Sequence, residues 1–358
     1  MRFYAFCCLL VPHQSVVPRS SVVPRSKNHV IPQISIIVVN WNGKALLNEC
    51  LGPLLRQEDA ACELILVDNG SSDGSVDWVR TKFPQIRLVQ LSTNQGFTGG
   101  NLAGLQAARG EFIALLNNDT RADERCLNEL LLPMISDSRV GISAAKLLLD
   151  GTTVINSAGI GLTTAAVGFD RGYGEDSYHY DVAEQVFGAC AAGVLYRRSM
   201  LADIGFLDND FFLYGEDVDL SFRAQIAGWK CVYVPSAIVY HKLNTTAGKL
   251  SDVHVYYHTR NLEFVWVKNM PTKLMIRYLH HKIFQEVGAF CYLCLRHRKW
   301  KPFFRAKRDA LKMLPLMMRR RREVQGQCRV SNAYLQAMLT SVFNKAWLRR
   351  KIFQFLRG

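Results

Sequence analysis

The sequence lacks long apolar runs and grouped cysteines. In the C-terminal quarter, the longest uninterrupted apolar run covers residues 287–295, well short of the roughly 20 residues that a transmembrane helix needs. Ten cysteines are scattered along the chain, without the paired spacing of a zinc site or the density of a disulfide scaffold. We therefore expect reduced, structural thiols in a cytoplasmic protein, and two buried thiols on a helix for Cys291 and Cys294.

Glycine-rich nucleotide fingerprints are also missing. The loop NWNG at residues 40–43 has one glycine where a dinucleotide-binding loop needs three, and STNQGFTGG at residues 92–100 does not give the spacing G-x-G-x-x-G. There is no Walker loop with its lysine. These absences argue against a nicotinamide cofactor and a P-loop nucleotide, so any nucleotide must be held in another way.

Acidic residues are scarce in the last part of the chain. Residues 272–358 contain 21 of the 44 Lys and Arg residues but only 3 of the 30 Asp and Glu residues, so the rest of the chain is mildly acidic. Such an asymmetry implies two units with different partners. We place the boundary between them after residue 271, with the main domain at residues 32–271.

Residues 1–31 show no pattern of a folded element. A short apolar run is followed by the hexamer SVVPRS, which occurs at residues 15–20 and again at residues 21–26. No small-residue cleavage motif follows the apolar run. We predict a disordered leader here, with a weak targeting or membrane segment as the alternative.

From Ile34 onward, strand and helix patterns alternate. The continuous β-branched run ISIIVV is typical of a strand buried on both faces of a parallel sheet. Further strand patterns occur at residues 63–68, 86–91 and 111–117, each separated from the previous one by a helical pattern. This alternation predicts an α/β fold with a doubly wound sheet. In such sheets, ligands bind beyond the carboxyl ends of the strands.

Polar residues and glycines follow each of these strands. They are Asn40 and Asn42 after the first strand, Asp68 and Asn69 after the second, Asn94, Gly96, Gly99 and Gly100 after the third, and Asn117, Asn118 and Asp119 after the fourth. A carboxylate such as Asp119 suits a hard divalent cation that keeps several waters and bridges to substrate phosphates. The alternative is an Asx turn or an N-cap for a helix expected to start near Ala122.

A second acidic cluster comes about a hundred residues later. Glu216, Asp217 and Asp219 stand just before and within an amphipathic helical pattern that runs to about Ala227. The helix dipole favours acidic residues in a first turn, so capping is the simpler interpretation. Three acids within four residues are more than a cap requires. A carboxylate here could act as a general base that deprotonates a hydroxyl nucleophile.

Together, these segments resemble a known family. The segments are SIIVVNWNG, LILVDNGSSDGS, NQGFTGGNLAGLQAARGEFIALLNNDT, FGACAAGVLYRRSML and FLYGEDVDLSFRAQIAGWKCVYVPSAIVYH. In order and separation, residues 34–270 look like an inverting family 2 glycosyltransferase of the GT-A fold, of the rhamnosyltransferase-like kind. The resemblance implies a doubly wound, mixed, mostly parallel sheet, here followed by a C-terminal basic amphipathic helical extension.

The resemblance also implies a role for each candidate residue. Nucleotide-sugar binding is implied for Asn40, Asn42, Asp68, Asn94, Gly96, Asn117 and Asn118, metal binding for Asp119 and His241, and catalysis for Asp217 as general base with Glu216 beside it. The triplet at residues 117–119 matches the D-x-D position of the family, with asparagine in place of the first acid. One carboxylate fewer would weaken the affinity for the metal.

The implied reaction transfers one sugar, with rhamnose as one candidate. A UDP- or dTDP-sugar would be the donor, a glycan or lipid-linked molecule the acceptor, and Mg²⁺ or Mn²⁺ the cofactor that stabilises the departing nucleoside diphosphate. The processive motif Q-x-x-R-W is absent and only RAQIAGW follows the acidic cluster, which favours non-processive transfer. A nucleotidyltransferase and a catalytically inactive sugar-nucleotide-binding protein are the alternatives.

Residues 272–358 mix apolar clusters with Lys and Arg. Trp300, Phe303 and Phe304 lie close to these charges, which suits an interfacial position on an anionic membrane surface. We expect a cytoplasmic enzyme that is peripheral at the inner face of the cell membrane. The alternatives are a helical extension packed on the main domain and RNA binding through the arginines at residues 319–322. We predict no nucleic-acid partner.

Overall fold

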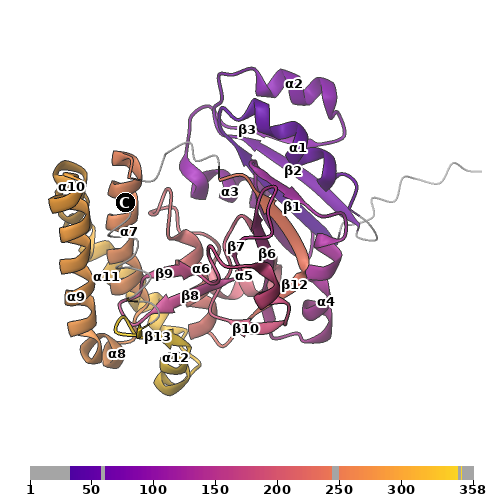
Figure 1. Cartoon of the computed structure of the whole chain (residues 1–358). Coiled ribbons are helices and arrows are strands. Elements are labelled where there is room, and N and C mark those ends of the chain that lie inside the picture. Colours follow the sequence, from indigo (N-terminus) through magenta and orange to yellow (C-terminus); the bar gives the residue numbers. More distant parts are fainter. Residues whose placement is uncertain (1–32, 58–60, 244–249, 346–347, 349–358) are drawn as a thin grey trace, which may run out of the picture. The chain divides into compact units, whose positions relative to one another are not determined.

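The structure is a computed structural model that describes residues 33–57, 61–243, 250–345 and 348 (Figure 1). All of these residues belong to one compact unit that starts at Pro32. The leader predicted at residues 1–31 lies outside the described residues.

A mixed, mostly parallel sheet forms the centre of the fold. Its main path has the strand order β10-β12-β6-β11-β4-β1-β2-β3, while β5 pairs with β12 and β7 pairs with β6. The bounds are β1 (Ile34–Asn40), β2 (Cys62–Asp68), β3 (Arg87–Gln90), β4 (Phe112–Asn117), β5 (Thr120–Ala122), β6 (Val140–Leu149), β7 (Ile155–Ser157), β10 (Glu184–Val186), β11 (Gly193–Arg197) and β12 (Lys230–His241). The predicted α/β fold is therefore confirmed.

Helices cover both faces of this sheet (Figure 1). Helices α1 (Lys44–Leu54), α2 (Ser75–Lys82) and α4 (Cys126–Ser136) share one apolar core with the sheet, and α3 (Gly96–Ala107), α5 (Arg198–Ile204) and α6 (Glu216–Ile226) share another. Strand β1 contributes to both, since Ile36 and Val38 lie in the first core and Ile37 in the second. Burial on both faces explains its uninterrupted apolar sequence.

The helix predicted to start near Ala122 begins later. Residues Thr120–Ala122 form β5, in which Thr120 lies opposite His241 of β12, and α4 starts only at Cys126. Asp119 lies in the turn between β4 and β5. Its backbone carbonyl accepts a hydrogen bond from the Lys242 amide at 3.0 Å. Asp119 is therefore not the N-cap of a helix, and the N-cap part of that alternative is wrong.

A helical layer follows the sheet. It contains α7 (Asp252–Asn269), α8 (Thr272–Arg277), α9 (Leu279–Phe290), the π-helical turn η2 (Cys291–Arg296), α10 (Trp300–Lys312), α11 (Leu314–Gly326) and α12 (Asn332–Met338). In Figure 1, α9 and α10 lie on the side of α7 that faces away from the sheet. No helix in the described ranges is long and apolar enough to cross a membrane.

This layer is packed on the sheet-bearing part of the chain. Phe222 of α6, Phe264 of α7 and Met317 of α11 share one apolar core. The Arg321 guanidinium of α11 donates to the backbone carbonyl of Met270 at 2.7 Å. A small second sheet joins β13 (Leu339–Thr340) to β8 (Ile160–Thr163) and β9 (Gly168–Asp170), and the 3₁₀ turn η1 (Ser177–Tyr180) follows β9. Residues 272–345 thus complete the fold.

Candidate active site

The predicted site residues lie at one edge of the sheet. β1, β2 and β4 are parallel, so their carboxyl ends meet there, with Asn40 opposite Asp68. β11 is antiparallel to β4 and has Gly193 opposite Leu116, so the chain enters β11 at the edge where β4 ends. There the Ala191 amide donates to Asp217 Oδ2 at 3.5 Å. Strand direction therefore places the two acidic clusters on the same edge.

The loops after β1 and β2 are held together by buried amides. Asn40 is fully buried and Asp68 nearly so. Asn40 Nδ2 donates to Ser75 Oγ at 3.2 Å, and Asn118 Nδ2 donates to Asn40 Oδ1 at 2.9 Å. Asp68 accepts from the Ser71 amide at 3.0 Å. In this arrangement, Asn40 and Asp68 brace the loops, whereas Asn118 stands nearer the surface.

Asn42 has a different setting. It is exposed and its φ of 51° is left-handed, a region that asparagine tolerates better than most residues. Its Oδ1 accepts from the Ser72 amide at 2.8 Å, and its own amide donates to Ser71 Oγ at 3.0 Å. Asn42 therefore fixes the second loop from the outside, at an exposed position.

The loop after β3 connects this edge to the segment before α6. Asn94 Oδ1 accepts from the Gly96 amide at 2.8 Å and from Asn69 Nδ2 at 3.1 Å. Gly96 has a φ of +73°, and a β-carbon there would collide with the Phe212 carbonyl. The Thr98 amide also donates to this carbonyl at 3.3 Å. A residue without a β-carbon is thus required where the two loops touch.

Asp119 and His241 face one another. His241 Nε2 lies 3.1 Å from Asp119 Oδ1, and a hydrogen bond of 2.8 Å joins His241 Nδ1 and Asn156 Oδ1. The hydrogen bond to Asn156 orients the imidazole ring, so that Nε2 and the Asp119 carboxylate point to the same place. Within the described residues, no group of three or more His, Cys, Asp or Glu side chains could hold a metal.

This pair fits a divalent cation that takes most of its ligands from water and from the substrate. One carboxylate oxygen and one imidazole nitrogen leave several positions for water and phosphate oxygens, as Mg²⁺ and Mn²⁺ sites at phosphates usually have. Asn156 of β7 holds the histidine from behind. Asn156 is not among the residues predicted from the sequence, because a single asparagine in a short strand gives no signal that would identify it.

Glu216 and Asp217 open α6 directly after Gly215, whose φ is +84°. Burial raises the pKa of Asp217 to about 6. Burial, reinforced by the charge of Asp217, raises the pKa of Glu216 to about 8. Among the described residues, Glu216 Oε2 has no hydrogen-bond partner, while Asp217 remains half-buried and receives the Val218 amide at 2.8 Å. Such perturbed carboxyl groups are typical of catalytic sites.

Asp219 belongs to the core rather than to this pair. It is fully buried and lies 2.9 Å from Arg223 Nε, 3.0 Å from Lys268 Nζ and 2.8 Å from Asn269 Nδ2. Although burial alone would raise its pKa, the charges of Lys268 and Arg223 lower it to about 2. The three acids that adjoin in sequence are thus divided between two environments, and Asp219 anchors α6 to α7.

Comparisons with known proteins identify the family of this chain. The model of the family described as "Glycosyltransferase like family 2" matches residues 32–261. A relative from Mycobacterium tuberculosis, named N-acetylglucosaminyl-diphospho-decaprenol L-rhamnosyltransferase, is 26% identical over 254 residues, which cover 64% of this chain and 82% of the relative. A Haloferax volcanii relative, named low-salt glycan biosynthesis hexosyltransferase, is 24% identical over 55% of this chain and 62% of its own length.

Two solved structures share the fold. GalNAc-T7 with UDP, GalNAc and Mn²⁺ has a TM-score of 0.58 at 12% identity, over 81% of this chain and 58% of that chain. Residues 1–349 of Staphylococcus aureus TarS with UDP have a TM-score of 0.50 at 18% identity, over 85% of this chain and 92% of that chain. With its family match, this chain therefore belongs to glycosyltransferase family 2, has the GT-A fold and is a glycosyltransferase.

Proposed function

We propose that the protein moves one sugar from a nucleoside diphosphate to a glycan or lipid-linked acceptor, with inversion and without processive elongation. The observation that carries this proposal is that a carboxylate–histidine pair and a pair of carboxyl groups lie at the same edge of the sheet. Asp119 and His241 stand at the end of β4 and β12, and Glu216 and Asp217 stand at the start of α6.

Asp217 is the proposed general base. Its carboxylate takes the proton of the acceptor hydroxyl while the hydroxyl oxygen attacks the anomeric carbon, and the nucleoside diphosphate leaves from the opposite face. This single displacement inverts the anomeric centre. With a pKa of about 6, Asp217 is ionised at neutral pH and more basic than an ordinary aspartate. Glu216, with a pKa of about 8, stays largely protonated beside it.

The other residues bind and orient the donor. Asp119 and His241 would hold Mg²⁺ or Mn²⁺, which supplies positive charge to the departing diphosphate. The exposed side chains Asn42 and Asn94 and the half-buried Asn118 line the edge on the nucleotide side. Asn40, Asp68 and Gly96 hold these loops from within, and Asn117 joins them at the end of β4.

The substrates are proposed from relatives. The mycobacterial relative is named for rhamnosyl transfer to a diphospho-decaprenol acceptor, so dTDP-rhamnose and a lipid-linked acceptor are the first pair to try, followed by UDP-sugars. We place the enzyme in the cytoplasm, peripheral at the inner face of the cell membrane, where such an acceptor would be reached in the synthesis of a cell-envelope polysaccharide.

A donor screen tests the proposal. Hydrolysis or transfer of several sugar nucleotides would be followed with Mn²⁺, with Mg²⁺ and with EDTA, in the wild type and in Asp119→Ala and Asp217→Asn. We expect metal-dependent turnover of one donor, lost in both variants and kept in Asp77→Asn, an exposed acid on α2. Failure of the wild type to bind or turn over any donor would favour a non-catalytic protein. Release of diphosphate from a nucleoside triphosphate and a sugar phosphate would indicate a nucleotidyltransferase.

A further inference from the structure

Helix α9 presents its apolar side outward. Leu279, Ile283, Phe284 and Val287 are 52%, 55%, 43% and 57% exposed. Their spacing of three and four residues places them along one side of the helix. A helix on the surface of a water-soluble protein ordinarily turns this side to the core. The exposed side of α9 is therefore a candidate contact surface.

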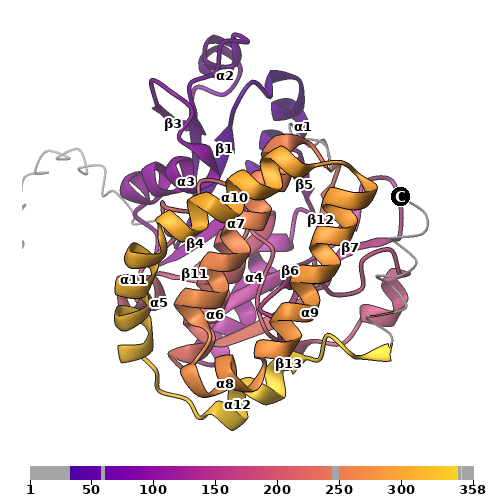
Figure 2. The ribbon, with the colours of Figure 1, turned by 90° about the vertical axis from the view of Figure 1, so that its left-hand side faces the viewer.

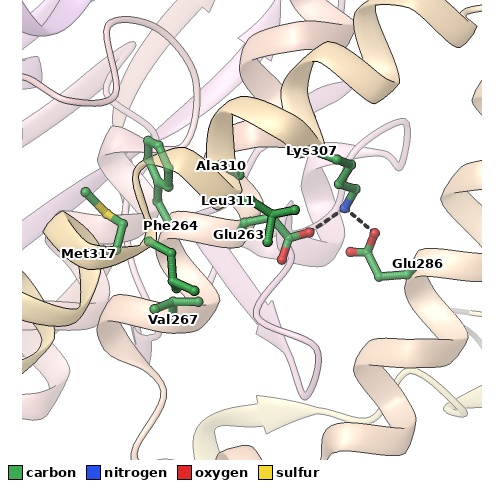
Figure 3. Close-up of a pocket in the computed structure, with 9 residues that line it drawn as sticks. Glu263, Phe264, Val267, Glu286, Lys307, Ala310, Leu311 and Met317 are labelled. Atoms are coloured by element: carbon green, nitrogen blue, oxygen red, sulfur yellow. Dashed lines mark hydrogen bonds and ion pairs between the residues drawn. The ribbon is translucent and has the colours of Figure 1, made fainter.

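The inward side of α9 is polar. Lys282 is buried, and its Nζ lies 2.7 Å from Glu286 Oε1 and 3.2 Å from Glu263 Oε1 of α7. Lys307 of α10 bridges the same two carboxylates (Figure 3). His281 Nδ1 is joined to Thr164 Oγ1 by a hydrogen bond of 2.6 Å. Because these ion pairs and this hydrogen bond fix the orientation of the helix, its apolar side has to face outward.

The apolar surface continues from α9 onto α10. Trp300, Phe304 and Leu311 are 41%, 53% and 70% exposed. The ring of Phe290, at the end of α9, lies 5.5 Å from that of Trp300 and 6.3 Å from that of Phe304. Figure 2 shows α9 and α11 on either side of α7, α10 across its upper end and α8 below it. We call the exposed apolar side chains of residues 276–318 on these helices the outer face.

A hollow opens within the outer face. It has a volume of about 300 Å³ and lies between α7, α9, α10 and α11 (Figure 3). Phe264, Val267 and Met317 line it, together with Leu311 and Leu314, which are also exposed. The Lys307 ammonium and its two glutamates form a polar wall. An apolar chain can therefore enter the hollow from the outer face.

Exposed cations lie on and between the helices that carry the outer face. The exposed cations include Lys273, Arg277, Arg298, Lys301, Lys312 and Arg319. In the part of the chain that the structure describes, no carboxylate lies within ion-pair distance of these six, and Glu286 and Asp309 pair with other cations. A second copy of the chain would bring the same positive charge and be repelled. Exposed apolar side chains together with exposed Lys and Arg on the same helical layer match an anionic lipid surface instead.

We propose that the outer face of α8–α11 is a docking surface for anionic bilayers. Its apolar side chains enter the boundary between headgroups and acyl chains, the exposed cations meet the lipid phosphates, and the hollow takes one hydrocarbon chain. The proposal rests on the proposed function only for its purpose, which is to hold the enzyme at a lipid-linked acceptor. The binding itself is independent of the donor and of catalysis.

Vesicle co-sedimentation tests the proposal. The full chain would be mixed with vesicles of phosphatidylcholine alone and of phosphatidylcholine with phosphatidylglycerol. We expect binding to the anionic vesicles that falls as salt is raised. The double substitution Phe284→Asp with Val287→Asp should lower the partition coefficient at least ~10-fold, because it places two carboxylates where apolar side chains entered the lipid.

A matched variant controls for the chemistry of the change. Leu132→Asp with Ile135→Asp places the same two charges, three residues apart, on exposed apolar positions of α4, and should bind like the wild type. Thermal unfolding and the hydrolysis of a soluble donor would show that both variants are folded. Hydrolysis that survives while vesicle binding is lost separates this proposal from the proposed function.

Several results would overturn the proposal. They are equal binding of the α9 variant and the wild type to vesicles, equal binding of the wild type to neutral and anionic vesicles, and no binding of the wild type to vesicles. A wild-type dimer that the α9 variant abolishes, without vesicle binding, would assign the outer face to a second copy of the chain.

Discussion

At the scale of single residues, Glu216 and Asp217 show how burial separates two adjacent carboxyl groups. Glu216 is buried and Asp217 is half-buried at the start of α6. Asp217 accepts hydrogen bonds from two backbone amides, whereas Glu216 Oε2 has no partner among the described residues. The pair therefore holds one proton near neutral pH, mostly on Glu216. An acceptor hydroxyl then meets the ionised Asp217 beside a largely protonated Glu216.

This difference predicts a pH profile. A general base works only in its ionised form, so kcat/KM should fall about tenfold per pH unit below the pKa of Asp217, which is about 6. Steady-state rates between pH 4.5 and pH 8, with circular dichroism to confirm folding, would measure the fall. A rate that stays constant down to pH 4.5 would remove Asp217 from this role.

Glu216 predicts an effect on stability. Its folded-state pKa of about 8 lies above the value of 4.5 expected in the unfolded chain. Its contribution to stability is thus present below pH 4.5 and is lost as pH rises towards 8. Glu216→Gln should therefore be more stable than the wild type at pH 7 by about 3 kcal/mol, with little difference at pH 4.5. Urea unfolding at both pH values measures this, and equal stabilities at pH 7 would contradict it.

Sequence reasoning reached some of these residues and not others. Asp119 and His241 stand at strand ends, where the pattern of an α/β sheet directs attention, and the structure brings them to 3.1 Å. Asn156 comes from a three-residue strand that no pattern marks. Asp219 could have been separated from its neighbours, since Arg223 follows it by four residues on the same helix. Its contact with Lys268 depends on tertiary packing alone.

At the scale of elements, Asp219 joins α6 to α7. Removing one partner of a buried ion pair leaves an uncompensated charge, so Asp219→Ala should lower the free energy of unfolding by about 3–5 kcal/mol. Because the pKa of Asp219 is lowered, its contribution to the stability of the wild type is present above pH 4 and is lost as pH falls towards 2. Urea unfolding at pH 7 measures the loss. Asp77→Asn, which removes an exposed pair with Arg80, should change stability by less than about 1 kcal/mol.

The contact between the β3 loop and the segment before α6 predicts another loss. Gly96→Ala would force a β-carbon against the Phe212 carbonyl at a φ of +73°, which costs about 1–3 kcal/mol. Because Asn94 is bonded to the same glycine, we expect weaker donor binding as well as lower stability. Calorimetric titration with the donor found in the screen would test both. Gly174→Ala, at a left-handed position with open space around it, controls for backbone strain alone.

At the scale of the whole molecule, the chain after residue 271 was the hardest part to interpret from sequence. Its basic composition and amphipathic helices could be read directly. Which side of each helix faces the protein could not be read from the sequence. Lys282 and His281 look like surface residues there. Their partners Glu263 and Thr164 come from distant parts of the chain. The sheet was easier to predict, since strands buried on both faces leave long apolar runs.

The same packing predicts what truncation would do. Cutting the chain after residue 271 would uncover Phe264, which packs with Met317 in the same core. It would also remove the Arg321 bonds to the carbonyls of Val267 and Met270. Each large apolar side chain returned to water costs about 1.5–3 kcal/mol, so a few of them exceed the usual stability of a domain.

We therefore expect residues 32–271 alone to be insoluble or to unfold without a cooperative transition, whereas the α9 variant keeps the melting temperature of the full chain within a few degrees. Solubility and thermal scans of both proteins measure this. If the truncated protein melted cooperatively at the full-length temperature, residues 272–345 would be an appendage. Vesicle binding could then be tested by deletion. If it fails to fold, only surface substitutions on α9 and α10 can separate membrane docking from stability.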